Sequence, residues 1–323
     1  MTNTRIDIHL EPAEAGRALR VDALAGLTAE PKWLPPKWFY DARGSELFEE
    51  ITRLAEYYPT RAERQILDLR AIDIAKRTDV TSLVELGSGS SEKTRLLLDA
   101  LRDHGTLKEL VCLDVSSSAL DEAVGALTDA YPSLTVQGVV ADFTEHLGRL
   151  NASSPRLVAF MGGTIGNLLP AERATFFASV RGVLDRDEWL LLGADLVKAP
   201  QTLVAAYDDA KGVTAEFNRN VLHVLNRELG ANFDVEAFEH RARWDADAEW
   251  IEMHLVATRD MVVGVPALDL VVTFAAGESM RTEISAKFRR EGLEGELRRA
   301  GFEPDFWWTD DEERFAVVLA RSV

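Results

Sequence analysis

A strand-to-helix turn near residue 87 carries the residue types best suited to hold a nucleotide cofactor. The largely apolar run 84–86 leads into Gly87-Ser88-Gly89, and a polar, then amphipathic segment follows. Gly87 and Gly89 can take positive φ angles and let a ligand come within contact distance of the backbone, which a Cβ would prevent. The turn therefore predicts a cofactor cradle, and an ordinary glycine-rich connection is the alternative.

The third glycine of a dinucleotide-binding turn is missing from this sequence. In the pattern Gly-x-Gly-x-x-Gly, that glycine packs the helix against the strand, and a pyrophosphate binds at the helix N-terminus. Glu92 stands at this position, and its charge suits a pyrophosphate poorly. An acidic strand followed by Gly-x-Gly resembles instead the first motif of class I S-adenosylmethionine-dependent methyltransferases, whose cofactor carries a sulfonium and an amino acid.

The next two strands end in residues that could complete such a cofactor site. The run 109–114 ends in Asp114, 25 residues after Gly89. A carboxylate at the end of the second strand can accept from both ribose hydroxyls, and an aspartate that only begins a turn is the alternative. A third strand, 135–140, is followed by Asp142 and Phe143. This pair resembles the adenine clamp of these methyltransferases, in which the acid accepts from the amino group and the Phe amide donates to the ring.

The elements that must position these residues follow in an alternating order. The near-continuous apolar runs 156–161 and 189–196 are typical of buried parallel strands. Helical patterns at 92–102, 117–131 and 171–184 separate the strands, and runs 304–308 and 314–319 predict a terminal hairpin. We therefore predict an α/β fold: a class I methyltransferase Rossmann-like doubly wound sheet with a terminal antiparallel hairpin.

The residues between the fifth strand and the hairpin are too numerous for one connecting helix. Segments 202–209 and 213–229 have helical patterns, and runs 238–244, 250–258 and 262–274 predict an antiparallel meander with a turn at 245–247. With the N-terminal region, this insert predicts a smaller α+β substrate-binding domain that acts as a lid. We expect a methyltransferase domain at 61–198 and 286–323 and a substrate-binding domain at 1–60 and 199–285.

Composition favours a cytoplasmic enzyme that acts on a small molecule. The formal net charge of −18 disfavours nucleic acid, because phosphate binding needs a basic surface. No run approaches 18 apolar residues, and residues 1–20 lack a basic segment followed by an apolar one, so we expect no membrane segment. The single Cys112 excludes an internal disulfide, and the six histidines lack metal-binding spacing, so we expect no metal.

Longer motifs narrow the resemblance to one family. The chain resembles histidine-specific methyltransferases of ergothioneine biosynthesis over nearly its whole length, in segments 35–41, 47–48, 51–54, 56–61, 162–167, 205–209, 217–220, 274–278 and 282–288. Enzymes of that family trimethylate the α-amino group of L-histidine to give hercynine, a betaine, as the first step of the pathway. The resemblance implies S-adenosylmethionine as cofactor, L-histidine as substrate, a monomer and no obligate protein partner.

The resemblance also implies the site residues. Those expected to bind the cofactor are Gly87, Lys93, Asp114, Asp142 and Phe143, with Lys93 at the cofactor carboxylate. Those expected to bind histidine are Tyr57, Gly162, Asn167, Tyr207, Met253, Glu283 and Ser285. Catalytic roles are implied for Tyr40, Asn167 and Glu283, with Tyr40 near the reacting amine.

These residue types suit the methylation of the α-amino group of a free histidine. Tyr207 and Asn167 are neutral donors that can hold a carboxylate without placing positive charge beside the amine, which must lose a proton before it attacks the methyl group. Glu283 and Ser285 can pair with the two imidazole nitrogens, so substrates without those nitrogens leave the pair unsatisfied. Taken singly, Tyr57, Met253 and Glu283 fit packing or surface roles better than binding roles. Two alternatives to a histidine methyltransferase remain. One is an N-methyltransferase for another small amino acid or amine, and the other is a non-catalytic cofactor-binding module.

Overall fold

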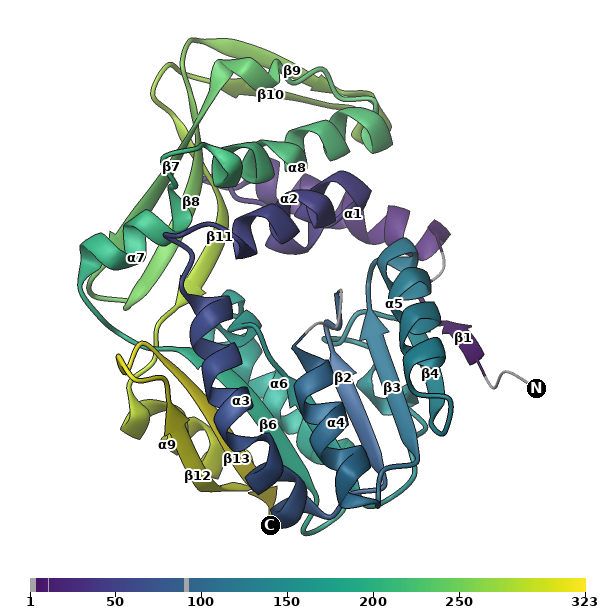
Figure 1. The fold of residues 1–323 in the computed structure, drawn as a ribbon. Coiled ribbons are helices and arrows are strands. Elements are labelled where there is room, and N and C mark those ends of the chain that lie inside the picture. The colour runs from purple at the N-terminus through teal and green to yellow at the C-terminus, as the bar shows by residue number, and fades with distance from the viewer. Residues whose placement is uncertain (1–3, 11, 90–92) are drawn as a thin grey trace. The chain divides into compact units, whose positions relative to one another are not determined.

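A computed structural model describes residues 4–10, 12–89 and 93–323, and the chain forms two units (Figure 1). The first unit comprises the described residues up to Leu10, Pro59–Val197 and Lys287–Val323. The second unit comprises the described residues after Leu10 up to Tyr58, and Lys198–Ala286. No helix in the described ranges is long and apolar enough to cross a membrane.

The first unit is built on a mostly parallel sheet. Its strands, in spatial order, are β1 (Thr4–Ile8), β4 (Thr135–Val140), β3 (Glu109–Asp114), β2 (Ser82–Leu86), β5 (Arg156–Phe160), β6 (Trp189–Asp195), β13 (Phe315–Ser322) and β12 (Phe302–Thr309). Strand β13 is antiparallel to both β6 and β12, and the other neighbouring pairs are parallel. The predicted fold class, including the terminal antiparallel hairpin, is confirmed.

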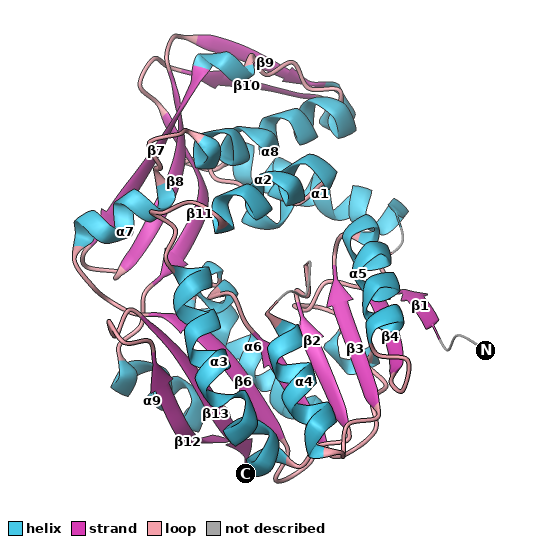
Figure 2. Ribbon diagram, in the orientation of Figure 1, coloured by secondary structure: helices cyan, strands magenta, loops and turns pink. Residues whose placement is uncertain are grey.

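Helices cover both faces of this sheet (Figure 2). They are α3 (Pro59–Thr78), α4 (Thr94–His104), α5 (Ser117–Ala130), α6 (Pro170–Val183) and α9 (Arg290–Arg299), with 3-10 turns η2 (Leu147–Arg149) and η3 (Thr164–Asn167). In Figure 1, α3, α4 and α5 lie in front of the sheet and α6 and α9 behind it. Because both faces are covered, every residue of β6 is buried, which explains its near-continuous apolar run before Asp195. The first residue of the predicted helix 92–102, Glu92, lies outside the described residues.

The extent of the two units corrects one predicted boundary. The sequence predicts residues 1–60 in the substrate-binding domain, but β1 pairs in parallel with β4, from Thr4 opposite Val136 to Ile8 opposite Val140. The described residues 4–10 therefore belong to the first unit. This strand is five residues long and lies at the sheet edge, so its sequence shows no extended buried run that would reveal it.

The second unit combines helices with two small sheets. Its helices are α1 (Pro12–Thr28), α2 (Ala42–Thr52), α7 (Pro200–Tyr207) and α8 (Val213–Leu229), with 3-10 turns η1 (Pro36–Phe39), η4 (Val235–Ala237) and η5 (Pro266–Leu268). Its strands are β7 (Phe238–Asp245), β8 (Trp250–Ala257), β9 (Met261–Val265), β10 (Leu270–Phe274) and β11 (Ser279–Ala286). The three-stranded sheet has the order β11-β8-β7, and β9 and β10 form a separate antiparallel pair.

The prediction of one meander through 262–274 was therefore wrong in its last strand. Pro266 begins η5 and Asp269 takes a left-handed conformation with φ 49°, so the run breaks into two strands that pair with each other. Strand β11 takes the place beside β8. The turn predicted at 245–247 is confirmed, because the Asp245 carboxylate accepts from the amides of Asp247 and Ala248.

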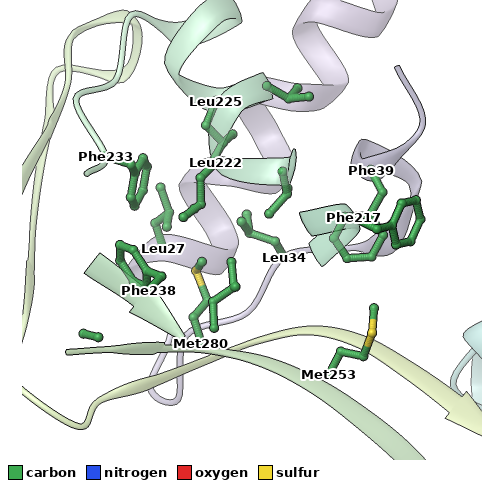
Figure 3. Packing of buried hydrophobic residues seen from close by; sticks show 14 of the residues in the cluster. Leu27, Leu34, Phe39, Phe217, Leu222, Leu225, Phe233, Phe238, Met253 and Met280 are labelled. Atoms are coloured by element: carbon green, nitrogen blue, oxygen red, sulfur yellow. The ribbon is translucent and has the colours of Figure 1, made fainter. Parts of the chain in front are cut away.

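Helices and the three-stranded sheet share one apolar core in this unit (Figure 3). The rings of Phe39 and Phe217 lie 4.8 Å apart between their centroids. Met253 and Met280 enter the same cluster from the strands. This core fixes helix α8 against the inner face of β7, β8 and β11, the face that carries several predicted site residues.

Candidate functional site

The turn after β2 has the conformation that its glycines predict. Gly87 has φ 68° and Gly89 has φ 49°, and a Cβ built on either would meet no described atom within 4 Å. The glycines are therefore needed for their backbone angles, and the space beside them is open. Both conditions suit a turn over which a ligand lies.

Asp114 at the end of β3 holds this turn in place. Its Oδ2 accepts from the Gly89 amide at 3.0 Å, and its Oδ1 accepts from the Ser116 amide at 2.9 Å. Burial raises the pKa of the Asp114 carboxyl, while these amides act in the opposite direction. Each carboxylate oxygen can accept a second hydrogen bond, as a ribose diol would require.

Asp142 and Phe143 follow the next strand along the sheet, β4. The Asp142 Oδ1 accepts from the amide and the hydroxyl of Thr144, at 2.8 and 2.6 Å. The Phe143 ring packs edge-on against Phe160, with centroids 5.0 Å apart, and against Phe176 at 5.8 Å. Since β2, β3 and β4 are parallel neighbours, the residues after them lie at one edge of the sheet, where open α/β sheets bind ligands.

Lys93 makes a contact that sequence reasoning missed. Its ammonium pairs with the carboxylate of Glu63, a fully buried residue of α3. The two oxygens of Glu63 also accept from the Gly162 amide, at 2.8 and 3.0 Å. A Cβ at Gly193 would lie 2.1 Å from Glu63 Oε1, so only glycine on β6 leaves room for this carboxylate. Glu63 thus joins a predicted cofactor residue to a predicted substrate residue, and nothing in the helical pattern of α3 marks it.

The loop after β5 presents Gly162 and Asn167. Gly162 and Gly163 have φ 79° and 74°, and the 3-10 turn η3 then ends at Asn167. Glu63 fixes the start of this loop, and the Gly166 amide donates to the Gly163 carbonyl at 2.9 Å. Both predicted substrate residues therefore sit on a short, internally bonded loop of the first unit.

The aromatic residues predicted in the second unit form a continuous chain. Tyr40 packs edge-on against Phe48, Phe48 against Tyr57, and Tyr57 against Tyr207, with centroids 5.7, 6.2 and 6.3 Å apart. The Tyr207 hydroxyl lies 2.7 Å from the Ser285 hydroxyl. Four of the predicted residues are thus connected within this unit, with Phe48 of α2 as the link between Tyr40 and Tyr57.

A β-bulge decides which residues of β11 share the core face. Met280 pairs with Leu255, whereas Glu283 pairs with Met253 and Ser285 with Ile251. Directly paired residues lie on one face of a sheet, and residues 280 and 283 could not both do so in a regular strand. The extra residue of the bulge, Thr282, therefore places Glu283 and Ser285 on the face that carries Met253.

Helix α8 supports this face through one buried amide. The Asn218 carbonyl oxygen accepts from the Thr282 hydroxyl at 2.6 Å, and its amide nitrogen lies 2.8 Å from His240 Nδ1. His240 Nε2 lies 2.7 Å from the Tyr207 carbonyl oxygen. Burial lowers the pKa of His240, although the Tyr207 carbonyl and Asp208 act in the opposite direction. Residues 217–220 belong to the segments that carry the family resemblance, which implies no role for Asn218.

The buried histidines predict a loss of stability in mild acid. Burial lowers the pKa of His240 and of His254 below 6.5, so both stay neutral in the folded chain at a pH where they become protonated in the unfolded chain. The unfolded state then binds more protons, and the free energy of unfolding falls as the pH drops through about 6.5. We expect a decrease of about 1 kcal/mol per pH unit for each histidine below this point.

Urea titrations between pH 7.5 and 5 would measure this slope. Carboxyl groups with lowered pKa, such as Glu252, contribute only below about pH 4.5, because their unfolded form ionises there. Burial raises the pKa of Asp114, which acts in the opposite direction because its folded form binds the proton more readily. The histidine contribution is therefore measured as the difference in slope between the wild type and the double variant His240→Gln/His254→Gln, and equal slopes between pH 7 and 5 would contradict the neutral burial of these two side chains.

The two sets of predicted residues lie in different units. The first unit carries Gly87, Lys93, Asp114, Asp142, Phe143, Gly162 and Asn167, and the second carries Tyr40, Tyr57, Tyr207, Met253, Glu283 and Ser285. Among the described residues, no group of three or more His, Cys, Asp or Glu side chains could hold a metal ion. Chemically, the first set offers a glycine turn and carboxylates, and the second offers neutral hydroxyl donors beside one carboxylate.

Comparison with known proteins gives consistent matches over nearly the whole chain. A family model described as "Histidine-specific methyltransferase, SAM-dependent" matches residues 19–322. The "Histidine N-alpha-methyltransferase" of Mycolicibacterium smegmatis is 54% identical over 312 residues, 97% of each chain. The protein of the same name from Mycobacterium tuberculosis is 52% identical over 314 residues, 97% of this chain and 98% of that one. "Ergothioneine biosynthesis protein 1" of Neurospora crassa is 29% identical over 328 residues, 98% of this chain and 36% of that one.

Proposed function

The chain belongs to the family of S-adenosylmethionine-dependent, histidine-specific methyltransferases, and we propose that it trimethylates the α-amino group of L-histidine to give hercynine. This is the first step of ergothioneine biosynthesis. The observation that carries the proposal is the identity above 50% to two histidine N-alpha-methyltransferases over 97% of the chain. The net charge of −18 supports a small-molecule substrate over nucleic acid, and the composition and resemblance support a cytoplasmic monomer.

The first unit fits the cofactor. We propose that the turn at Gly87 carries the amino-acid part of S-adenosylmethionine, with Lys93 at its carboxylate, and that Asp114 accepts from the ribose hydroxyls. Asp142 and the Phe143 amide would bind the adenine. The open space beside the two glycines and the carboxylate at the end of β3 support these roles. When bound, the cofactor supplies a methyl group activated by its sulfonium.

The second unit fits the side chain of histidine. We propose that Glu283 and Ser285 pair with the imidazole nitrogens, with Met253 beneath them on the same face. Tyr207 would donate to the substrate carboxylate, with Asn167 of the first unit as a second donor. Tyr57 and Gly162 are proposed to complete substrate binding. Because these donors are neutral, they leave the amine able to lose its proton, and the reaction then depends mainly on positioning.

Tyr40 is proposed to orient the reacting amine and to accept or relay its proton. Its ring packs edge-on against Phe48 and against Phe217, whose centroid lies 5.4 Å away, and phenylalanine can keep both ring contacts. Tyr40→Phe should therefore keep the fold and lower kcat by about ten- to a hundredfold. Single-turnover rates for each of the three methylations would test this, and unchanged rates would remove the role.

The proposed function is tested with the purified chain, S-adenosylmethionine and an equimolar mixture of the amino acids, read by mass spectrometry. Trimethylated histidine as the sole product is the expected result. Methylation of another amino acid would keep the fold and cofactor and overturn the substrate assignment. Cofactor binding without any product would favour a non-catalytic module.

A further inference from the structure

Asn218 is a fully buried residue of α8 whose side chain is bonded at both ends. Its Oδ1 accepts from the Thr282 hydroxyl at 2.6 Å, and its Nδ2 donates to the His254 carbonyl at 3.1 Å. A backbone carbonyl can only accept, so the orientation of this amide is determined by its partners. The same Nδ2 group lies 2.8 Å from His240 Nδ1.

This orientation selects one tautomer of His240. Since the Asn218 amide nitrogen is a donor, His240 Nδ1 must accept and carries no proton. His240 Nε2 lies 2.7 Å from the Tyr207 carbonyl oxygen, which can only accept, so the ring proton is on Nε2. The neutral Nε2–H form satisfies both contacts, and it connects Asn218 to the backbone of Tyr207.

The other end of Asn218 supports the bulge in β11. The hydroxyl of Thr282, the extra residue, contacts both the Asn218 oxygen and the Met253 carbonyl at 3.1 Å. The bulge places Glu283 and Ser285 on the inner face of the sheet. One amide therefore holds the strand that presents the proposed imidazole contacts and, through His240, the helix end that presents Tyr207.

We propose that Asn218 is the positioning residue that sets histidine selection, by holding the Thr282 bulge and the Nε2–H tautomer of His240 together. The inference rests on the substrate roles proposed for Tyr207, Glu283 and Ser285. Asn218 itself makes no contact with the reacting atoms in this scheme. Its loss should raise KM for histidine and leave KM for S-adenosylmethionine unchanged, because the proposed cofactor residues belong to the first unit.

Asn218→Asp is the sharpest test, because it keeps the shape and removes the donors. When this aspartate is ionised, His240 can satisfy both neighbours only as an imidazolium, which donates from Nδ1 to the aspartate and from Nε2 to the Tyr207 carbonyl. The charges that act on His240 are Asp208, Asp209 and Arg219: the two carboxylates favour the imidazolium and the guanidinium opposes it. We expect kcat/KM for histidine to fall about thirtyfold at pH 8, mostly through KM.

The ratio of variant to wild-type kcat/KM should recover several-fold as the pH falls from 8 to 6. Adding His240→Gln to the variant removes the titrating group and should abolish this recovery. Asn226→Asp is the matched control, because Asn226 lies on the same helix and exchanges similar hydrogen bonds with the backbone of Phe233. It should change neither KM nor the shape of the pH profile.

Nitrogen-15 NMR of the histidine rings gives a readout that does not depend on activity. His240 should show the Nε2–H form in the wild type, and the Nδ1–H form there would overturn the inference. If Asn218→Asp does not fold, Thr282→Val removes the other half of the contact and should raise KM for histidine alone. If the wild type methylates histidine and the variants keep its KM for histidine, the role of Asn218 is refuted. If the wild type makes no methylated histidine, the proposed function is refuted.

Discussion

Replacing Glu283 with alanine should lower kcat/KM for histidine by about a hundred- to a thousandfold, with little change in KM for S-adenosylmethionine. The bulge at Thr282 places Glu283 on the inner face beside Met253. Without its carboxylate, one imidazole nitrogen enters the site without an acceptor, and an unpaired buried polar group costs far more than a lost contact. Competition between histidine and phenylalanine, read by mass spectrometry, measures the lost preference.

Glu239→Ala is the control for this prediction. Glu239 lies on β7 of the same sheet, and its side chain is 59% exposed and paired with Arg241. The same change of charge on this sheet should leave histidine kinetics within a factor of two. If both variants retain the wild-type preference for histidine over phenylalanine, Glu283 does not bind the imidazole.

Lys287→Met should cost about 3–5 kcal/mol of stability in the first unit. The Lys287 ammonium is fully buried and lies 2.9 Å from Asp195 Oδ2, whose carboxylate is 4% exposed. Methionine fills a similar volume but removes the lysine charge from beside that buried carboxylate. A chain of two units can unfold in two thermal transitions. The transition of the first unit is the one that shifts to higher temperature when S-adenosylhomocysteine is added, because a ligand stabilises the unit that binds it.

A loss of this size should lower that transition by about 10 °C in calorimetry. The control is Arg70→Met in α3, where the pair with Asp73 has both side chains nearly half exposed and an N–O distance of 3.5 Å. An exposed pair of this kind contributes about 0–1 kcal/mol, so the transition should hardly move. Equal shifts in the two variants would show that the Lys287 pair does not stabilise the first unit more than a surface pair.

Much of the first unit could be predicted because its signals are local. Strands that are buried on both faces appear in the sequence as apolar runs. The candidate cofactor-binding residue stands at the end of each run or directly after it. Gly87, Asp114 and Asp142 were therefore assigned from sequence to one edge of the sheet, and the structure places them there. Their roles toward the cofactor stay predictions that binding measurements must test.

Most of the candidate site residues of the second unit came from motif resemblance, because their residue types alone favoured packing or surface roles. The structure shows that Tyr40, Tyr57, Tyr207 and Ser285 form a chain of contacts. It also divides the run 262–274 at Pro266, because proline has no amide hydrogen to donate within a sheet.

By itself, the sequence determined the order of the elements, the cofactor turn and the family, since each depends on residues close together along the chain. Only the tertiary structure decided which buried polar groups meet. Glu63 reaches Lys93 because Gly193, on a distant strand, lacks a Cβ, and Asn218 meets Thr282 across 64 residues. Such contacts depend on strand register and on one extra residue in β11, and neither leaves a periodic signal in the sequence.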